Sequence, residues 1–561
     1  MWCCQPRSRL AFFWSMLPNE KTAVENEAEK WVFVVPYAPR RYCLPLCTLP
    51  FRRWMLLVAS ILVQMCNGSL YAWSILNPHI DEHIQDKARD SVPPAKELAV
   101  VTFYIAVGAH GFASALFGPF VERHGPRHSL IIAVCLHIVG HIVSFVSVYY
   151  KSYIGLYIGY GVFCGAGFGI GYIAPVSAIL KWFPDLRGTA GGFAVCGVGL
   201  GAALWGNLYD PLIRSVGVDG VFLVHGAVLC FGLLLSAFVL RTPPPNYVVG
   251  GRNPHGIKVI DPPKQSVTSH IGLSTDSAER VSAVLGDIQQ DNYVSVFDYR
   301  EQELGEAEIL YHNKIKNLCI RECAFSVDFA FLYLVFMAAC APGTILLSRV
   351  YSIGGDVYID EGDENLVRLV MFMAFSDFLG HLLCPLISDG FIRMAQLNPA
   401  YGRKIIIGVL VVNQIVVLIL LKSFIGDSKT FVPFEVVLCF LIFSYGGVFG
   451  IIPSLLTDMY GLYNSGTMHG IILTASSICA IGGGLTFQHY FFSIVSKFPE
   501  EKIVNGLNAA YEFNLRWLLV VACVGCALVP LVRTNPVDRF FPGYQYSLFG
   551  RPLIRIIKQD Y

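Results

Sequence analysis

The chain has little charge for its length. Charged residues make up 14% of the 561 amino acids, whereas soluble domains carry about 25%. Hydrophobic residues reach 54% and the mean hydropathy is +0.55, which excludes a soluble enzyme. The net charge of +1 provides no basic field for nucleic acid, and the sequence contains no run of carboxylates that would form an acidic tail.

Motifs for cofactors, metals and secretion are also scarce. The 17 cysteines are scattered, and many fall inside apolar stretches, so they predict neither a disulfide framework nor a zinc site. Glycine-rich segments occur at 161–171, 188–201 and 482–484, but none has the lysine and the serine or threonine of a nucleotide-binding P-loop. The N-terminus is at best a weak signal peptide. We expect no cofactor, no metal and no enzymatic activity.

Apolar stretches long enough to cross a bilayer are abundant. A membrane-spanning helix takes roughly 20 apolar residues, because each backbone polar group must be satisfied within the segment. The predicted spans are 54–76, 98–121, 128–149, 153–180, 188–209, 219–240, 324–347, 366–388, 403–422, 433–456, 466–491 and 515–533. The expected fold class is an all-α membrane protein with twelve transmembrane helices in two six-helix bundles.

Polar segments divide the chain into five regions. We expect a cytosolic N-terminal segment (1–52), an N-terminal bundle (53–241), a disordered cytosolic linker (242–322), a C-terminal bundle (323–534) and a cytosolic tail (535–561). Arginine and lysine are concentrated before the first span and after the second and eighth, whereas acids follow the first and seventh. This bias places both termini in the cytosol of a cell whose plasma membrane or organelle membrane holds the protein.

The turns after the second and eighth predicted spans are similar to each other. They read GPFVERHGPR and CPLISDGFIR. The residues that share this pattern are Gly118, Glu122, Arg123, Gly125, Arg127, Asp389 and Arg393. The pattern resembles the cytoplasmic signature of the major facilitator superfamily, which implies gating: glycine permits close helix approach, and the carboxylate pairs with arginine or caps a neighbouring helix as the two halves rock. An interfacial ion pair without a gating role is the alternative.

Two further segments resemble the oxalate:formate antiporter and monocarboxylate transporter-like branch of that superfamily. They are NGSLYAWSIL at 67–76 and GFGIGYIAPVSAILKWFPDLRGTAGGFAVCGVGLGA at 167–202. The resemblance covers both transmembrane halves but not the linker or the termini. It implies a monomeric secondary transporter that moves a small organic acid by alternating access, with proton symport or exchange. Trp73 is assigned to the substrate site on this resemblance alone.

The sequence departs from that branch at two positions. The branch holds a dicarboxylate between an arginine on helix eight and a lysine on helix eleven, and its motifs place His381 and Ser476 at those positions. Losing two charge-assisted contacts, each worth about 1.5–3 kcal/mol, makes oxalate an unsuitable substrate. We expect a monocarboxylate, for example a vitamin such as pantothenate, with amino acids or neutral metabolites as the alternative.

Ionisable groups within the spans are candidates for proton coupling. Asp377 and His381 are four residues apart on the eighth span, so they share a helix face, and imidazole takes up protons near neutral pH. A purely structural bond between the two is the alternative. Asp328, near the start of the seventh span, is a second candidate, which could instead cap the helix or extend to the interface. His137 and His141 are expected to form a satisfied pair within the bundle rather than a relay.

Polar and aromatic stripes complete the candidate substrate site. Gln64, Asn67, Tyr71 and Ser74 lie on one face of the first span, which should face a cavity because exposure to lipid would be costly. The fourth span has a comparable aromatic face, explained equally well by helix packing, which comprises Tyr157, Tyr160, Cys164, Phe168 and Tyr172. The substrate-binding candidates are Gln64, Asn67, Tyr71, Trp73, Tyr157, Tyr160, Phe168, His381, His469 and Ser476.

The expected partners are a small-molecule substrate, protons and the lipid bilayer, and no nucleic acid. A transporter-shaped receptor or sensor remains a second interpretation. Saturable uptake with counterflow would distinguish a transporter from such a receptor, and from a channel, which would conduct without saturation.

Overall fold

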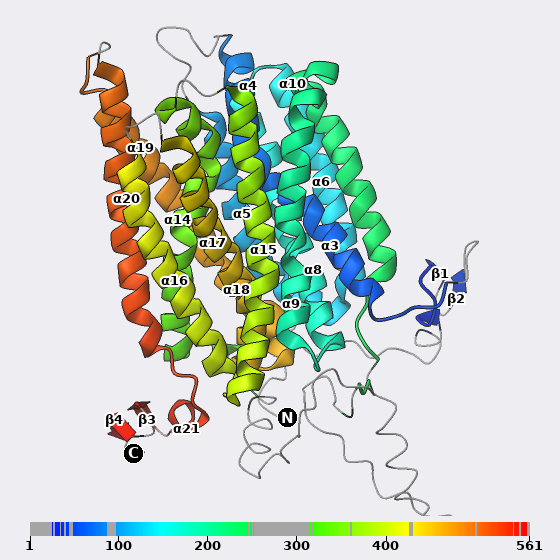
Figure 1. The fold of residues 1–561 in the computed structure, drawn as a ribbon. Helices are drawn as coiled ribbons and strands as arrows, with labels where there is room; N and C mark the ends of the chain where they lie inside the picture. The colour runs from blue at the N-terminus through cyan, green and yellow to red at the C-terminus, as the bar shows by residue number, and fades with distance from the viewer. Residues whose placement is uncertain are drawn as a thin grey trace, which may run out of the picture.

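A computed structural model describes residues 49–86, 97–244, 318–358, 362–425, 430–499, 502–541, 543–548 and 551–557, with short pieces at 25, 28–33, 35–38, 41–43, 247–249, 251 and 315. Long helices whose axes are roughly parallel make up most of these residues (Figure 1). Most of the predicted linker at 242–322 lies outside the described residues, as do parts of the predicted N-terminal segment and tail.

The N-terminal half begins with a span that changes its winding midway. This span comprises α3 (Met55–Asn67), the 3₁₀ turn η1 (Gly68–Ala72) and α4 (Trp73–Gln85). The elements that follow are α5 (Ala99–His124), α6 (Pro126–Tyr149), α7 (Tyr153–Leu156), the π-helix η2 (Tyr157–Cys164), α8 (Gly165–Trp182), α9 (Arg187–Val195) and α10 (Gly197–Val239).

Two of the predicted spans lie in one nearly continuous helical stretch, Arg187–Val239. Its 53 residues would extend for about 80 Å as a straight helix, more than twice the hydrocarbon thickness of about 30 Å. Gly217 interrupts the stretch with φ 78° and ψ 166°, values that glycine adopts readily, and the chain turns back there (Figure 1). Eleven helical stretches among the described residues can span a membrane, and this reversal makes them consistent with the twelve predicted spans.

The C-terminal half repeats the plan of long helices. Its elements are α13 (Ile320–Ala324), α14 (Val327–Val357), α15 (Asp363–Ala395), α16 (Pro399–Phe424), α17 (Phe431–Tyr460), α18 (Leu462–Ile478), the π-helix η4 (Cys479–Gly483), α19 (Gly484–Val495), α20 (Ile503–Leu528) and the 3₁₀ turn η6 (Val529–Leu531). Outward-facing apolar side chains recur at helical spacing, as at Val409, Val412 and Val416 on α16, which suits a lipid environment.

Small residues bring the two halves into close contact along two helix pairs, α5 with α18 and α10 with α15. A Cβ added at Gly470 of α18 would lie 2.2 Å from the backbone oxygen of Ser114, and one added at Gly199 of α10 would lie 2.4 Å from the nitrogen of Phe378. Glycines such as Gly470 and Gly199 therefore serve close helix packing between the halves.

The bundle has two distinct ends. We call the end where α10 finishes and α14 begins the linker end, and the opposite end the far end. The strand pairs β1 (Val35–Ala38) with β2 (Arg41–Cys43) and β3 (Gly543–Leu548) with β4 (Arg551–Ile557) are antiparallel, and both lie at the linker end with α21 (Pro536–Arg539) (Figure 1). The described parts of both terminal segments are thus at the same end of the molecule.

Candidate functional site

A pair of tyrosines joins the two halves at the middle of the bundle. Tyr71 in η1 and Tyr445 in α17 bring their hydroxyl oxygens to 2.8 Å, and each residue lies near the midpoint of its span. Thr344 of α14 donates a further hydrogen bond of 3.4 Å to the Tyr445 oxygen. We take this contact as the centre of a candidate passage between the halves.

The predicted polar stripe of the first span is buried within the protein. Gln64 Nε2 donates to the backbone oxygen of Tyr172 at 3.1 Å, and Asn67 Nδ2 donates to Gln64 Oε1 at 2.9 Å. Ser74, the fourth residue of the stripe, is 1% exposed. Asn67 Oδ1 has no hydrogen-bond partner among the described residues, which leaves an acceptor free for a solute.

Asp377 and His381 form a close pair near the middle of α15. His381 Nδ1 is 2.9 Å from the backbone oxygen of Asp377 and 3.3 Å from its Oδ1, and both side chains are 2% exposed. The backbone of α17 presses against the pair, since a Cβ at Gly446 would lie 2.6 Å from Asp377 Oδ1 and 2.8 Å from His381 Nδ1. Gly446 follows Tyr445, so the carboxylate and the imidazole lie next to the tyrosine contact.

The Asp377 carboxylate faces hydroxyl groups from both halves. It is close enough to interact electrostatically with Tyr71, Tyr172 and Tyr445. Its Oδ2 has no hydrogen-bond partner among the described residues. A buried carboxylate in this state is costly, and a proton or a solute donor would stabilise it.

His469 and Ser476 of α18 differ in their surroundings. The ring of His469 lies against Tyr172 of α8, with centroids 5.6 Å apart, and neither ring nitrogen has a hydrogen-bond partner among the described residues. Ser476 Oγ donates to the backbone oxygen of Leu473 within its own helix at 2.7 Å. His469 thus lies between the halves with unused polar atoms, whereas Ser476 is satisfied locally.

Four further candidates pack inside the N-terminal half. Trp73 donates from Nε1 to the backbone oxygen of Ala99 at 3.1 Å and lies against Tyr160, with ring centroids 4.3 Å apart. Phe168 packs on Tyr160, with centroids 5.9 Å apart, and Tyr157 donates to the backbone oxygen of Leu98 at 3.1 Å. This geometry favours the packing interpretation of the aromatic face, and a substrate contact for these residues stays a prediction.

One group in the described residues has the spacing of metal ligands. Atoms of His137, His141 and Cys164 lie within 4.8 Å of one another, and all three side chains are buried. The two ring nitrogens of His141 are already engaged, by the backbone oxygen of His137 at 2.8 Å and by His225 Nδ1 at 3.1 Å. The predicted satisfied pair therefore holds for His141 alone, because neither ring nitrogen of His137 has a hydrogen-bond partner among the described residues.

Glu122 forms the first of the two carboxylate–glycine contacts that help to close the linker end. Its Oε1 accepts hydrogen bonds from Ser177 Oγ at 2.7 Å and from the backbone nitrogen of Gly466 at 3.0 Å, and its Oε2 pairs with Lys181. Gly466 belongs to α18, so a carboxylate of the N-terminal half binds the beginning of a helix of the other half. A Cβ at Gly466 would lie 2.1 Å from Glu122 Oε1, so glycine is required for this approach. We call this contact the Glu122 clasp.

Asp389 forms the second contact with the halves exchanged. Its Oδ2 accepts hydrogen bonds from the Thr189 backbone nitrogen at 2.7 Å and hydroxyl at 2.9 Å, at the beginning of α9. Arg403 pairs with its Oδ1 at 2.9 Å, and a Cβ at Gly188 would lie 2.1 Å from the same oxygen. Asp389 therefore caps the beginning of α9 and pairs with an arginine, the two arrangements that the motif implied, whereas Glu122 binds the fifth residue of α18. We call this contact the Asp389 clasp.

The cations that complete the clasps were not identified from the sequence. Asp458 binds Arg187 of the other half at 3.2 Å and Arg403 at 2.7 Å. The repeated tripeptides Arg187-Gly188-Thr189 and Ser465-Gly466-Thr467 could have revealed both clasps, because each supplies the glycine that meets a carboxylate.

The remaining residues of the predicted motif have separate structural roles. Gly125 adopts φ 81° between α5 and α6, Arg127 Nη2 donates to the backbone oxygen of Phe238 at 3.0 Å, and Arg393 Nη2 donates to that of Asp185 at 3.2 Å. Gly118 allows close packing, since its Cβ would lie 2.8 Å from Thr467 Cα. Arg123 is partly buried at the end of α5.

Asp328 lies at the linker end, away from the tyrosine contact. Arg533 donates to it from Nε at 2.8 Å and from Nη2 at 3.0 Å, in a bidentate ion pair that is almost fully buried. This geometry favours a structural attachment of the C-terminal segment, and a proton-coupling role for Asp328 stays a prediction.

The far end is closed by a different set of contacts. Arg349 Nη2 of α14 pairs with Glu97 Oε2, just before α5, at 2.6 Å. Gln488 of α19 donates to the backbone oxygen of Glu97 at 2.7 Å, and Asn77 of α4 donates to that of Ser348 at 3.2 Å. Both ends of the candidate passage are therefore closed in this structure.

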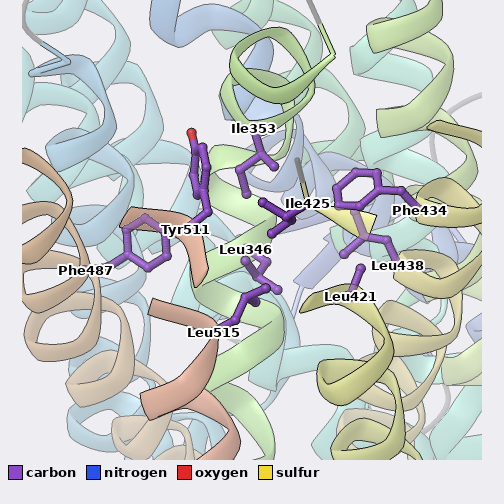
Figure 2. A pocket seen from close by; sticks show the side chains of 9 residues that line it. All are labelled: Leu346, Ile353, Leu421, Ile425, Phe434, Leu438, Phe487, Tyr511 and Leu515. Carbon is purple, nitrogen blue, oxygen red and sulfur yellow. The ribbon is translucent and has the colours of Figure 1, made fainter. Parts of the chain in front are cut away.

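Figure 2 shows a pocket that lies within the C-terminal half rather than between the halves. Its lining residues are Leu346, Ile353, Leu421, Ile425, Phe434, Leu438, Phe487, Tyr511 and Leu515. Because nearly all of these side chains are apolar, the pocket suits hydrocarbon and not a carboxylate.

Comparison with known proteins decides the family. A family model described as Major Facilitator Superfamily matches residues 58–484. The chain belongs to this superfamily. Members of the major facilitator superfamily are membrane transporters rather than enzymes, so the fold class and the class of function that the sequence predicted are confirmed.

Individual relatives within the superfamily are distant. The uncharacterized MFS-type transporter YhjX of Escherichia coli (strain K12) is 20% identical over 430 residues, which cover 76% of this chain and 86% of that protein. Monocarboxylate transporter 14 of Homo sapiens is 21% identical over 504 residues, which cover 84% of this chain and 90% of that protein. The oxalate:formate antiporter of Oxalobacter formigenes is 28% identical over 193 residues, which cover 34% of this chain and 43% of that protein. The predicted resemblance to this branch of the major facilitator superfamily is confirmed.

Solved structures of the superfamily share the fold. The proton:xylose symporter XylE matches with a TM-score of 0.54 at 14% identity, covering 85% of this chain and 95% of that one. The human organic anion transporter MFSD10 matches with a TM-score of 0.50 at 12% identity, covering 85% and 99%.

Proposed function

We propose that this chain is a secondary active transporter of small organic monoanions that couples their movement to protons. The observation that carries the proposal is the buried Asp377–His381 pair beside the Tyr71–Tyr445 contact, midway between two closed ends. Alternating access would open the linker end and the far end in turn around this centre.

The charges around the centre favour a single carboxylate. Ser476 provides a hydroxyl that is bonded within its own helix, and His381 provides one positive charge only when it is protonated. When Asp377 is also protonated, one transient cation balances a monoanion but not a dianion. Two relatives are named for carboxylate transport, the oxalate:formate antiporter and monocarboxylate transporter 14, which supports this class of substrate.

Proton coupling follows from the chemistry of the pair. Protonated His381 would attract the substrate carboxylate, and loss of the proton would release it on the other side. Histidine changes its charge between about pH 5 and pH 8, so coupling of this kind operates at physiological pH. We further propose that the linker end faces the cytosol, because arginine and lysine are concentrated there, and that a single chain suffices, because the two halves that meet at the Tyr71–Tyr445 contact both belong to it.

A neutral substrate is the second candidate. Asn67, Gln64 and Tyr71 offer uncharged hydrogen-bonding groups beside the centre, which would suit an amino acid or another uncharged metabolite. A carboxylate and a neutral analogue of the same size would distinguish the two candidates.

The test is uptake of labelled lactate and pantothenate into liposomes that contain the purified protein, at about pH 6 and about pH 7.5. We expect saturable uptake with counterflow that is several-fold faster at the lower pH. His381→Ala and Asp377→Asn should lower uptake at least about tenfold and remove its pH dependence, whereas His489→Ala, an exposed histidine of α19, should change neither. Unaltered, equally pH-dependent uptake by His381→Ala would refute the coupling. Binding without flux would indicate a receptor.

A further inference from the structure

Arg349 is a buried cation with unused hydrogen-bond donors. Its side chain is 1% exposed, and its Nε and Nη1 have no partner in hydrogen-bonding geometry among the described residues, although the Tyr104 hydroxyl is close enough to interact with the guanidinium. A guanidinium carries five N–H donors arranged to bind a carboxylate through two parallel bonds. The ion pair with Glu97 leaves most of this capacity free.

The surroundings of Arg349 suit an organic anion. The guanidinium carbon lies 5.2 Å from the ring centroids of both Phe487 and Phe491, so two aromatic rings line the site. Glu97 is 28% exposed and therefore lies on the outer side of the guanidinium. A carboxylate that displaced Glu97 would keep the charge balanced, and its apolar remainder would contact the rings.

The position of Arg349 connects the far end to the centre. Thr344, five residues earlier on α14 and so about 7.5 Å along the helix, bonds the Tyr445 hydroxyl. Ser348 Oγ donates to the Tyr104 hydroxyl across the two halves at 3.4 Å. A solute bound at Arg349 would therefore be about one and a half helical turns from the residue that bonds Tyr445.

We infer that Arg349 is the carboxylate-binding residue of an entry subsite at the far end, where Glu97 occupies the cation until a monocarboxylate substrate displaces it. The inference rests on the proposed function and adds the residue that selects the charge of the substrate. It also supplies a fixed cation, on helix seven, to a passage from which the cations of helices eight and eleven are absent.

Equilibrium binding to the purified protein in detergent tests this inference. The probes are two matched pairs, pantothenate with its neutral alcohol panthenol and lactate with lactamide. We expect Arg349→Gln to weaken binding of the acids at least about tenfold and to leave the neutral analogues unchanged. Arg349→Lys, which keeps a point charge without the planar fork, should restore part of the affinity. Arg516→Gln, a control on an exposed arginine of α20, should change nothing.

Glu97→Gln provides a test that misfolding cannot imitate, because the expected effect is a gain in affinity for the two acids. Removing the competing carboxylate should tighten binding of both acids several-fold and leave the neutral analogues unchanged. Equal changes for acids and neutral analogues, or no change in either variant, would show that Glu97 and Arg349 form a structural pair only. Wild-type protein that binds neither acid would overturn the proposed function together with this inference. Wild-type binding with unaltered acid affinity in Arg349→Gln would overturn the inference alone.

Discussion

The two ends of the passage are closed by different chemistry. At the linker end, the Glu122 clasp and the Asp389 clasp follow one plan, in which a carboxylate of one half accepts a backbone N–H of the other half beside a glycine. The hydroxyl donor comes from the opposite half at Asp389 (Thr189) but from the same half at Glu122 (Ser177). At the far end, one ion pair between Glu97 and Arg349 acts with neutral hydrogen bonds. The linker end, where the motif is repeated, therefore holds more buried charge than the far end.

This difference has a consequence for the transport cycle. Opening the linker end separates two carboxylates from helix beginnings, and each charge-assisted bond contributes about 1.5–3 kcal/mol. Opening the far end breaks one ion pair and hydrogen bonds that contribute about 0.5–1.5 kcal/mol each. We expect the empty transporter to open more readily at the far end than at the linker end.

The largest effect should come from the glycines of the clasps. In Gly466→Ala or Gly188→Ala, the new methyl group would lie 2.1 Å from the carboxylate of Glu122 or of Asp389, so that carboxylate must move and lose its bonds. We expect each variant to lower transport at least about tenfold and to speed hydrogen exchange at the beginnings of α9 and α18, measured by mass spectrometry.

Gly390→Ala is the matched control, because Gly390 follows Asp389 on the same helix and a Cβ there has no neighbour within 4 Å. Its transport should equal that of the wild type. A strong loss of transport in only one of the two variants, Gly466→Ala or Gly188→Ala, would contradict the shared plan of the linker end, since it would show that the two clasps are not equivalent.

The sequence predicted the linker end better than the far end, for a physical reason. The carboxylates Glu122 and Asp389 occur one position apart in two similar turns, so the repeat itself marked them. Glu97 and Arg349 have no such counterparts. Arg349 lies two residues beyond the predicted seventh span, and its pairing with a residue far away in the chain is not visible in the sequence.

The centre of the passage was predicted in part. Helical spacing placed Asp377 beside His381 and grouped Gln64 with Asn67, because contacts within one helix follow from its periodicity. The same spacing grouped Tyr160 and Phe168 with Tyr172, although in the structure Tyr172 alone of these three contacts a ring of the other half. Periodicity identifies a face of a helix but not the helix that packs against it.

A moderate effect is expected from a neutral bond at the far end. Gln488→Ala removes the hydrogen bond to the backbone oxygen of Glu97 and leaves the Glu97–Arg349 ion pair in place. Hydrogen exchange near the beginning of α5 should rise about two- to tenfold, with no change at α9 and α18. Faster exchange at the linker end as well would show that the two ends do not open independently.

The smallest effect, and one shared by both ends, is expected at the centre. Tyr71→Phe removes one partner of the 2.8 Å contact, but Tyr445 keeps its bond from Thr344, so closure should weaken only about threefold. Tyr445→Phe removes both bonds and should weaken closure more. Because the contact lies midway along both spans, hydrogen exchange should rise by similar factors at α5 near the far end and at α9 near the linker end. A rise at one end only would assign the tyrosine pair to that gate instead of to the centre.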